Sequence, residues 1–250
     1  MRLIMLALAA ALATAQAAEA AEIRVVGSNA IRTVLEAAGP AFEKQSGHKV
    51  GLGFGTSAQL TKRIQSGERT DAVFITPETI DQLTQQGLTV KDARVTIARS
   101  LVGVAVRTGS PHPDISTPDA FRRALLAAKT VTFSDPATGA TSGVHTAKLL
   151  ERLGIAAEMK PKLKLGDGSS TGPWVASGEA ELAVQQISAL KPVAGIDIVG
   201  PLPAELQLVT VLDAAIAANV QDVAVVKEFI VFLRTPDGAA IIRAKGLEPN

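Results

Sequence analysis

The chain has 250 residues, and 47% of them are hydrophobic, which is enough to form the core of one large domain or two small ones. A net charge of +1 and an aromatic content of 3% leave neither a broad basic surface nor many stacking rings, so a nucleic-acid partner is not expected. Cysteine is absent, and His48, His112 and His145 are too far apart for a zinc motif, so no metal is expected.

The N-terminal 20 residues have the pattern of a secretory signal peptide. Arg2 precedes an apolar run from Leu3 to Leu12, and two Ala-x-Ala cleavage patterns follow. The apolar run is shorter than the roughly 20 residues that a membrane-spanning helix needs. We therefore expect residues 1–20 to be removed and the protein to be a periplasmic monomer.

From residue 23 onward, β-branched runs alternate with segments of helical hydrophobic spacing. Glycines at positions 47, 67 and 87 mark the ends of the first three helices. In chain order, the pattern predicts strands at 23–28, 48–57, 70–78, 100–109, 129–136, 161–167, 180–188 and 206–216, helices at 30–47, 58–68, 79–88, 119–128, 142–155 and 172–180, and two further helices within 220–247.

This alternation predicts an α/β fold with two Rossmann-like lobes, each a mostly parallel sheet covered by helices. The last strand and its two helices have no sheet of their own, so we expect them to complete the first lobe. The expected lobes are 21–104 plus 205–250 and 105–204. Two crossovers, near 101–106 and 203–210, would form a hinge with a cleft between the lobes.

Turns after predicted strands repeat one combination: a glycine, a hydroxyl and then the start of a helix. Free N–H groups at a helix start carry partial positive charge, hydroxyls add donors, and ligands of α/β sheets bind at the carboxyl ends of the strands. Ser and Thr are also ordinary helix caps, so each single turn has a purely structural alternative. Together the turns predict a site for a small anion, with candidate contacts at Ser28, Asn29, Thr56, Ser57, Thr141, Ser142, Ser169 and Ser170.

Several longer segments resemble the type II periplasmic solute-binding proteins, in the branch of molybdate-binding proteins. They are the V-x-x-S turn at 25–28, FGTSAQLTKRIQSGERTDAVFIT at 54–76, SDPATGATSGVHTAKLLERLGI at 134–155 and KPKL at 160–163. The resemblance implies two α/β lobes, with the last segment returning to the first lobe. It also implies capture of an oxyanion for an ABC transporter, with contacts at Ser28, Ser57 and near Ser142.

The chain differs from the molybdate-binding branch at positions that are candidates for ligand contacts. Gln185 and Gln186 stand where the family has a tyrosine, and the sequence contains no tyrosine. Because glutamine offers an acceptor as well as donors, whereas a fully deprotonated oxyanion needs donors only, molybdate is disfavoured. Arg32 is either a two-point clamp for a carboxylate or a solvent-facing helix residue. The pattern resembles a divergent branch that handles organic acids, to which aconitate isomerase is related.

Two features bear on catalysis. Residues 168–172 fit G-x-S-x-G, but no histidine follows Ser170, so the hydrolase order fails and we interpret the turn as a helix cap. His145 is a candidate general base for a proton shift, with a cap neighbour or a ligand hydrogen-bond donor as the alternatives.

No cofactor is expected, because Thr56 occupies the final glycine position of the dinucleotide-binding pattern. The sequence thus favours a binding protein for a small oxyanion or carboxylate. The alternative is an isomerase that shifts a proton in an unsaturated carboxylate on the same scaffold.

Overall fold

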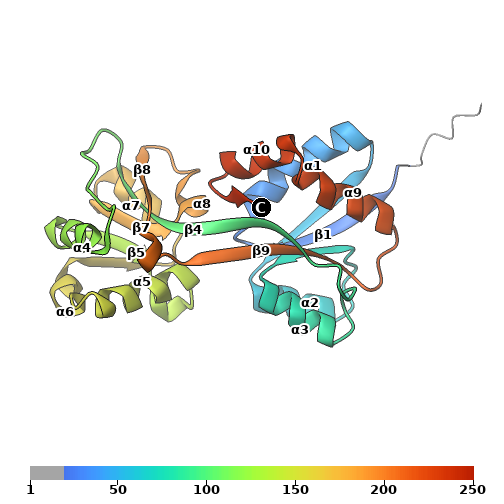
Figure 1. The fold of residues 1–250 in the computed structure, drawn as a ribbon, viewed down its shortest axis with the longest axis horizontal. Coiled ribbons are helices and arrows are strands. Elements are labelled where there is room, and N and C mark those ends of the chain that lie inside the picture. The colour runs from blue at the N-terminus through green and yellow to red at the C-terminus, as the bar shows by residue number, and fades with distance from the viewer. Residues whose placement is uncertain (1–19) are drawn as a thin grey trace, which may run out of the picture.

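The computed structural model describes residues 20–250, so the predicted signal peptide lies outside the described residues except for its last position. Two α/β lobes lie side by side, and long strands pass between them (Figure 1). The strands form one sheet in the order β2-β1-β3-β9-β4-β7-β5-β6, with β8 and β10 paired to β4. The predicted fold class is confirmed.

The first lobe contains parallel strands with helices on both faces. Strand β1 pairs in parallel with β2 and β3, so their carboxyl ends meet at one edge. Side chains of β1 alternate between two cores: Ile23 and Val25 pack under α1, α9 and α10, and Val26 packs with α2 and α3. The elements are β1 (Glu22–Ser28), α1 (Arg32–Ser46), β2 (Lys49–Gly55), α2 (Ser57–Gln65), β3 (Ala72–Ile75), α3 (Pro77–Gln85), β9 (Val209–Ile216), α9 (Val223–Leu233), α10 (Pro236–Ala244) and β10 (Glu248–Pro249).

The second lobe repeats this arrangement around β5, which runs parallel to β6 and β7. Its main core gathers apolar side chains from the strands, α4 and α5, including the fully buried Phe121 and Phe133. The elements are α4 (Pro118–Ala127), β5 (Val131–Ser134), η1 (Pro136–Thr138), α5 (Thr141–Arg152), α6 (Ala156–Met159), η2 (Lys160–Lys162), β6 (Leu163–Gly166), α7 (Thr171–Ser177), β7 (Leu182–Gln186), α8 (Ile187–Leu190), β8 (Ile196–Pro201) and η3 (Ala204–Leu206).

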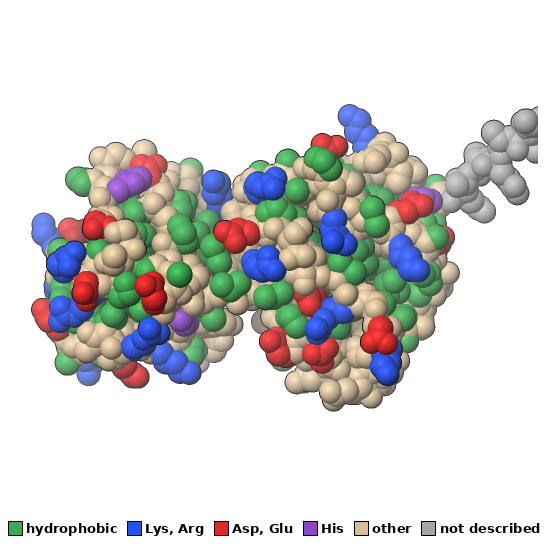
Figure 2. All heavy atoms as spheres, viewed as in Figure 1, with side chains coloured by type: hydrophobic (Ala, Val, Ile, Leu, Met, Phe, Trp, Pro, Cys, Tyr) green, Lys and Arg blue, Asp and Glu red, His purple; other side chains and the backbone are tan. Residues whose placement is uncertain are grey.

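Strand β4 (Val95–Arg107) belongs to both lobes. Up to Leu101 it pairs antiparallel with β9, and from Val102 onward it pairs with β7 and β8. At this change of partner, the side chain of Gln207 accepts a hydrogen bond from Val102 N (2.9 Å) and donates one to Val102 O (3.0 Å). Figure 2 shows that the molecule narrows between the two lobes.

The structure contains elements that the sequence does not predict, and it shifts the start of two predicted strands. Strand β8 is absent from the sequence prediction, β4 begins at Val95 instead of residue 100, and β9 begins at Val209 after the η3 turn. Both β4 and β8 depend on pairing with distant strands, which local hydrophobic spacing does not reveal. The lobe boundaries near 104 and 205 remain predictions. The helix ends at Gly47, Gly67 and Gly87 are confirmed, since all three glycines have φ between 73° and 85°.

Candidate functional site

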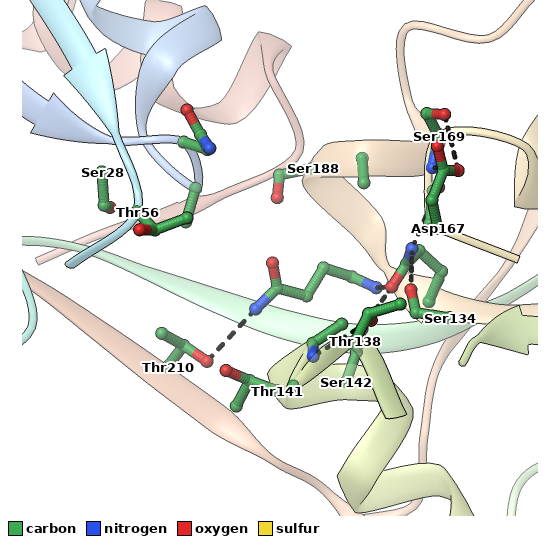
Figure 3. Close-up of a pocket in the computed structure, with 18 of the residues that line it drawn as sticks. Ser28, Thr56, Ser134, Thr138, Thr141, Ser142, Asp167, Ser169, Ser188 and Thr210 are labelled. Atoms are coloured by element: carbon green, nitrogen blue, oxygen red, sulfur yellow. Dashed lines mark hydrogen bonds between the residues drawn. The ribbon is translucent and has the colours of Figure 1, made fainter. Parts of the chain in front are cut away.

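A cleft of about 880 Å³ lies between the lobes. Its lining comes from the carboxyl ends of β1, β2 and β3 on one side, and from those of β5, β6 and β7 on the other. Figure 3 shows Ser28 and Thr56 on one side of this cleft, with Asp167 and Ser169 on the opposite side. Ligands of open α/β sheets bind at this edge, so the cleft is the candidate site.

Most of the predicted site residues meet in the cleft. The ones that line it are Ser28, Asn29, Thr56, Ser57, Thr141, Ser142, Ser169, Gln185 and Gln186. Of the described residues, Ser170, Arg32 and His145 were predicted for the site but do not belong to its lining. The four turns therefore converge as expected from the strand order, although not every side chain in them faces the cleft.

In the first lobe, hydroxyl and amide protons remain available to a ligand. Ser28 Oγ is buried and has no hydrogen-bond partner among residues 20–250. Thr56 caps α2 by accepting from Gln59 N (3.3 Å), which leaves its own proton free. Asn29 Oδ1 accepts from Arg32 Nη2 (2.9 Å), so the Asn29 amide nitrogen remains a donor.

Helix α2 begins at Ser57 and α5 at Thr141, and both residues line the cleft. The first N–H groups of a helix lack intrahelical partners and carry partial positive charge. The two lobes thus each direct one helix start of at least two turns toward the cleft. This arrangement suits an anionic group.

In the second lobe, Gln185 connects the elements around the cleft. Ser142 Oγ donates to Gln185 Oε1, while Gln185 Nε2 donates to Ser134 Oγ (2.8 Å) and Gly168 O (3.3 Å). Gln185 is buried, and both ends of its amide are occupied. Its role in this structure is to hold the start of α5 against β5 and the turn after β6.

The turn after β6 is organised by Asp167. The Asp167 carboxylate accepts hydrogen bonds from the hydroxyls of Ser169 (2.7 Å) and Ser170 (3.0 Å). The Ser169 hydroxyl, with a further contribution from Ser170, holds the pKa of the Asp167 carboxyl below its usual range. The predicted capping by the Ser170 side chain is wrong: Ser170 occupies the N-cap position of α7, but its hydroxyl makes no bond to the helix.

The placements of Arg32 and His145 do not support the special roles predicted for them. The Arg32 guanidinium lies 4.5 Å above the Phe54 ring and 3.8 Å from Glu36, and its side chain is 44% exposed. His145 Nε2 lies 2.8 Å from the carbonyl oxygen of Leu206, which can only accept, so this nitrogen carries the proton. Both side chains are engaged outside the cleft lining.

Sequence reasoning missed several lining residues, including Ser134, Asp167, Ser188 and Thr210. Asp167 had a usable signal, since an aspartate two residues before a serine often accepts from that turn. Ser188 and Thr210 had none, because their place in the cleft depends on long-range contacts. Thr210 Oγ1 accepts from Gln186 Nε2 (3.3 Å), and Ser188 Oγ lies 3.2 Å from Ser100 Oγ.

Neutral hydrogen-bonding groups dominate the electrostatics of the cleft. Among the described residues, Asp167 is the only lining residue with an ionisable side chain. Within residues 20–250, no three His, Asp or Glu side chains come together in a way that could hold a metal ion. An anion in this cleft would therefore be held by N–H and O–H groups.

Known proteins are similar to this chain over most of its length. The model of the bacterial extracellular solute-binding proteins matches residues 23–248. The chain is 33% identical over 233 residues to an aconitate isomerase from a Pseudomonas species, covering 91% of this chain and 87% of that protein. It is 27% identical over 238 residues to the molybdate-binding protein ModA of Azotobacter vinelandii, covering 92% and 91%.

The fold has close structural neighbours. A substrate-binding domain attributed to a molybdenum ABC transporter of Clostridium difficile superposes with a TM-score of 0.80 at 17% identity, covering 92% of this chain and 99% of that domain.

In the described part of the chain, no helix combines the length and apolarity needed to cross a membrane.

The two lobes and the cleft between them are the architecture of a solute-binding protein. The chain belongs to the family of bacterial extracellular solute-binding proteins.

Proposed function

We propose that this protein captures a small oxyanion or organic carboxylate in the cleft and delivers it to an ABC importer. The observation that carries the proposal is the pairing of two helix starts, α2 and α5, with free hydroxyls across one interlobe cleft. The relationship to a molybdate-binding protein supports the same task. In this role the protein acts as a periplasmic monomer, because both lobes must be presented to the transporter.

The second candidate function is isomerisation of an unsaturated carboxylate by a proton shift. The 33% identity to an aconitate isomerase favours it. Such a reaction needs a group that accepts a proton from carbon and returns it, with a pKa near the working pH. In the cleft, the ionisable side chain is Asp167, whose pKa lies below the usual range, and His145 Nε2 is bound to Leu206. We therefore place binding ahead of catalysis.

One experiment separates the two functions. The purified protein is titrated with molybdate, sulfate, phosphate, succinate, citrate and both isomers of aconitate, and the shift in melting temperature is recorded. A ligand at a hundred times its Kd should stabilise the fold by about 2.7 kcal/mol. Each aconitate isomer is then incubated with the protein and followed by proton NMR.

Stabilisation without interconversion of the isomers is the expected result. Interconversion would establish the isomerase instead. No stabilisation by any anion of the panel would contradict both candidate functions.

A further inference from the structure

The hydroxyls around the cleft do not all have a proton to offer. Gly168 O can only accept, so the Gln185 nitrogen must face it and the Gln185 oxygen must face Ser142. The Ser142 hydroxyl proton is therefore donated to Gln185. Toward a ligand, the Ser142 oxygen can offer only lone pairs.

Asp167 accepts further protons of the second lobe, as Gln185 accepts the proton of Ser142. All hydrogen bonds from Ser169 and Ser170, from both hydroxyls and both backbone N–H groups, go to Asp167 Oδ1, at distances of 2.7 to 3.3 Å. Asp167 Oδ2 has no partner among the described residues, and the side chain is exposed and lines the cleft. Asp167 thus brings a carboxylate oxygen without a protein donor to the lining of a site that otherwise suits an anion.

The first lobe has the opposite character. Ser28 and Thr56 keep their hydroxyl protons, and α2 directs its first N–H groups toward the same space. These donors lie across the cleft from Asp167 (Figure 3). The cleft therefore has free hydroxyl protons on the wall of the first lobe, while the wall of the second lobe carries an unpartnered carboxylate oxygen as well as the start of α5.

We infer that the ligand is a hydroxy acid, whose anionic group binds the first lobe and whose hydroxyl donates to Asp167 Oδ2. The inference rests on the proposed function and specifies its ligand class. A ligand without any donor would set oxygen lone pairs against the Asp167 carboxylate, which is repulsive. An ammonium group has three protons to satisfy, whereas a hydroxyl needs only the one acceptor that Asp167 Oδ2 supplies.

The test uses ligands that differ by one group. Calorimetry gives the Kd of succinate, malate and aspartate, and of tricarballylate and citrate, for the unmodified protein. A hydrogen bond to a charged group predicts that malate and citrate bind at least about 10-fold more tightly than succinate and tricarballylate. This comparison needs no variant.

The substitution Asp167→Asn then identifies the residue responsible. It keeps an acceptor for Ser169 and Ser170 but removes the charge, so the preference for the hydroxylated member should fall to less than about 3-fold. The matched control is Asp135→Asn, at the corresponding turn after β5 and outside the cleft lining; it should leave the preference unchanged.

Equal affinities within each pair, tighter binding of aspartate than of malate, or a preference that survives Asp167→Asn would overturn the inference. So would a bare oxyanion that binds more tightly than every hydroxy acid, and in these cases the proposed function would stand. If no carboxylate or oxyanion binds, the proposed function fails as well.

Discussion

Ser28 illustrates how one side chain can be set aside for a ligand. Its hydroxyl lies at the end of β1, is only 7% exposed as a residue and has no partner in the described structure. An unpaired buried hydroxyl is destabilising by about 1–3 kcal/mol, and a ligand oxygen that accepts its proton removes that penalty. The side chain therefore contributes to affinity and not to the stability of the empty protein.

We predict that Ser28→Ala weakens ligand binding about 10- to 100-fold and does not lower the free energy of unfolding of the empty protein. Calorimetry and urea unfolding measure the two quantities. The exposed Ser66 supplies the control, because Ser66→Ala removes a hydroxyl outside the cleft lining and should leave Kd unchanged. Lower stability with unaltered affinity would show that Ser28 has a structural role only.

Gln185 shows what residue types alone do not reveal. The sequence suggested Gln185 as a candidate ligand contact, and the residue lines the cleft, but its hydrogen bonds inside the second lobe depend on Ser134, Ser142 and Gly168, which lie 17 to 51 positions away. Residue types alone also do not show that the Ser142 hydroxyl donates its proton to Gln185, because this follows from the orientation of the Gln185 amide. Donor and acceptor roles are properties of neighbours in space, so the polarity of the cleft could not be predicted.

At the scale of elements, the start of α5 is fixed by its close approach to β5. A Cβ on Gly143 would lie 2.1 Å from the carbonyl oxygen of Ser134, which is a backbone atom and cannot move aside cheaply. Gly39, inside α1, has room: its nearest neighbour would be a Leu52 methyl at 3.6 Å. The two glycines make a matched pair within helices.

We predict that Gly143→Ala lowers the free energy of unfolding by about 1–3 kcal/mol and weakens anion binding, because α5 must shift away from β5. Gly39→Ala should be neutral or stabilise by up to about 1 kcal/mol through helix propensity. Urea unfolding and calorimetry compare the two variants. Equal effects on stability would contradict the packing argument.

The elements themselves were largely predictable because their signals are local. Strand–helix alternation and the glycines at helix ends, such as Gly47 and Gly87, can be recognised from residues that are close together in the sequence. Strand β8 escaped prediction because it forms by pairing with β4, which is distant in the sequence. The convergence of the turns followed from parallel strand order, since parallel strands end at one edge.

At the scale of the whole molecule, function depends on how the lobes are joined. Strand β4 exchanges β9 for β7 and β8 at Val102, and here an ordinary ladder would leave backbone groups unpaired. The Gln207 amide fills this gap: its oxygen accepts from Val102 N and Leu208 N, and its nitrogen donates to Val102 O and Leu202 O. Gln207 does not line the cleft in the described structure, yet it connects backbone segments near the change of strand partner between the lobes.

The last prediction concerns this joint. Gln207→Leu keeps the size of the side chain but removes its hydrogen bonds, so the free energy of unfolding should fall by about 2–4 kcal/mol. Because a ligand that contacts both lobes needs them in one arrangement, Kd should also rise at least about 5-fold without any lost ligand contact. The control Gln45→Leu, on the exposed face of α1, should change neither quantity appreciably. Urea unfolding and calorimetry with the same anion give both numbers, and lower stability with an unchanged Kd would mean that the lobes reach their binding arrangement independently of the Gln207 amide.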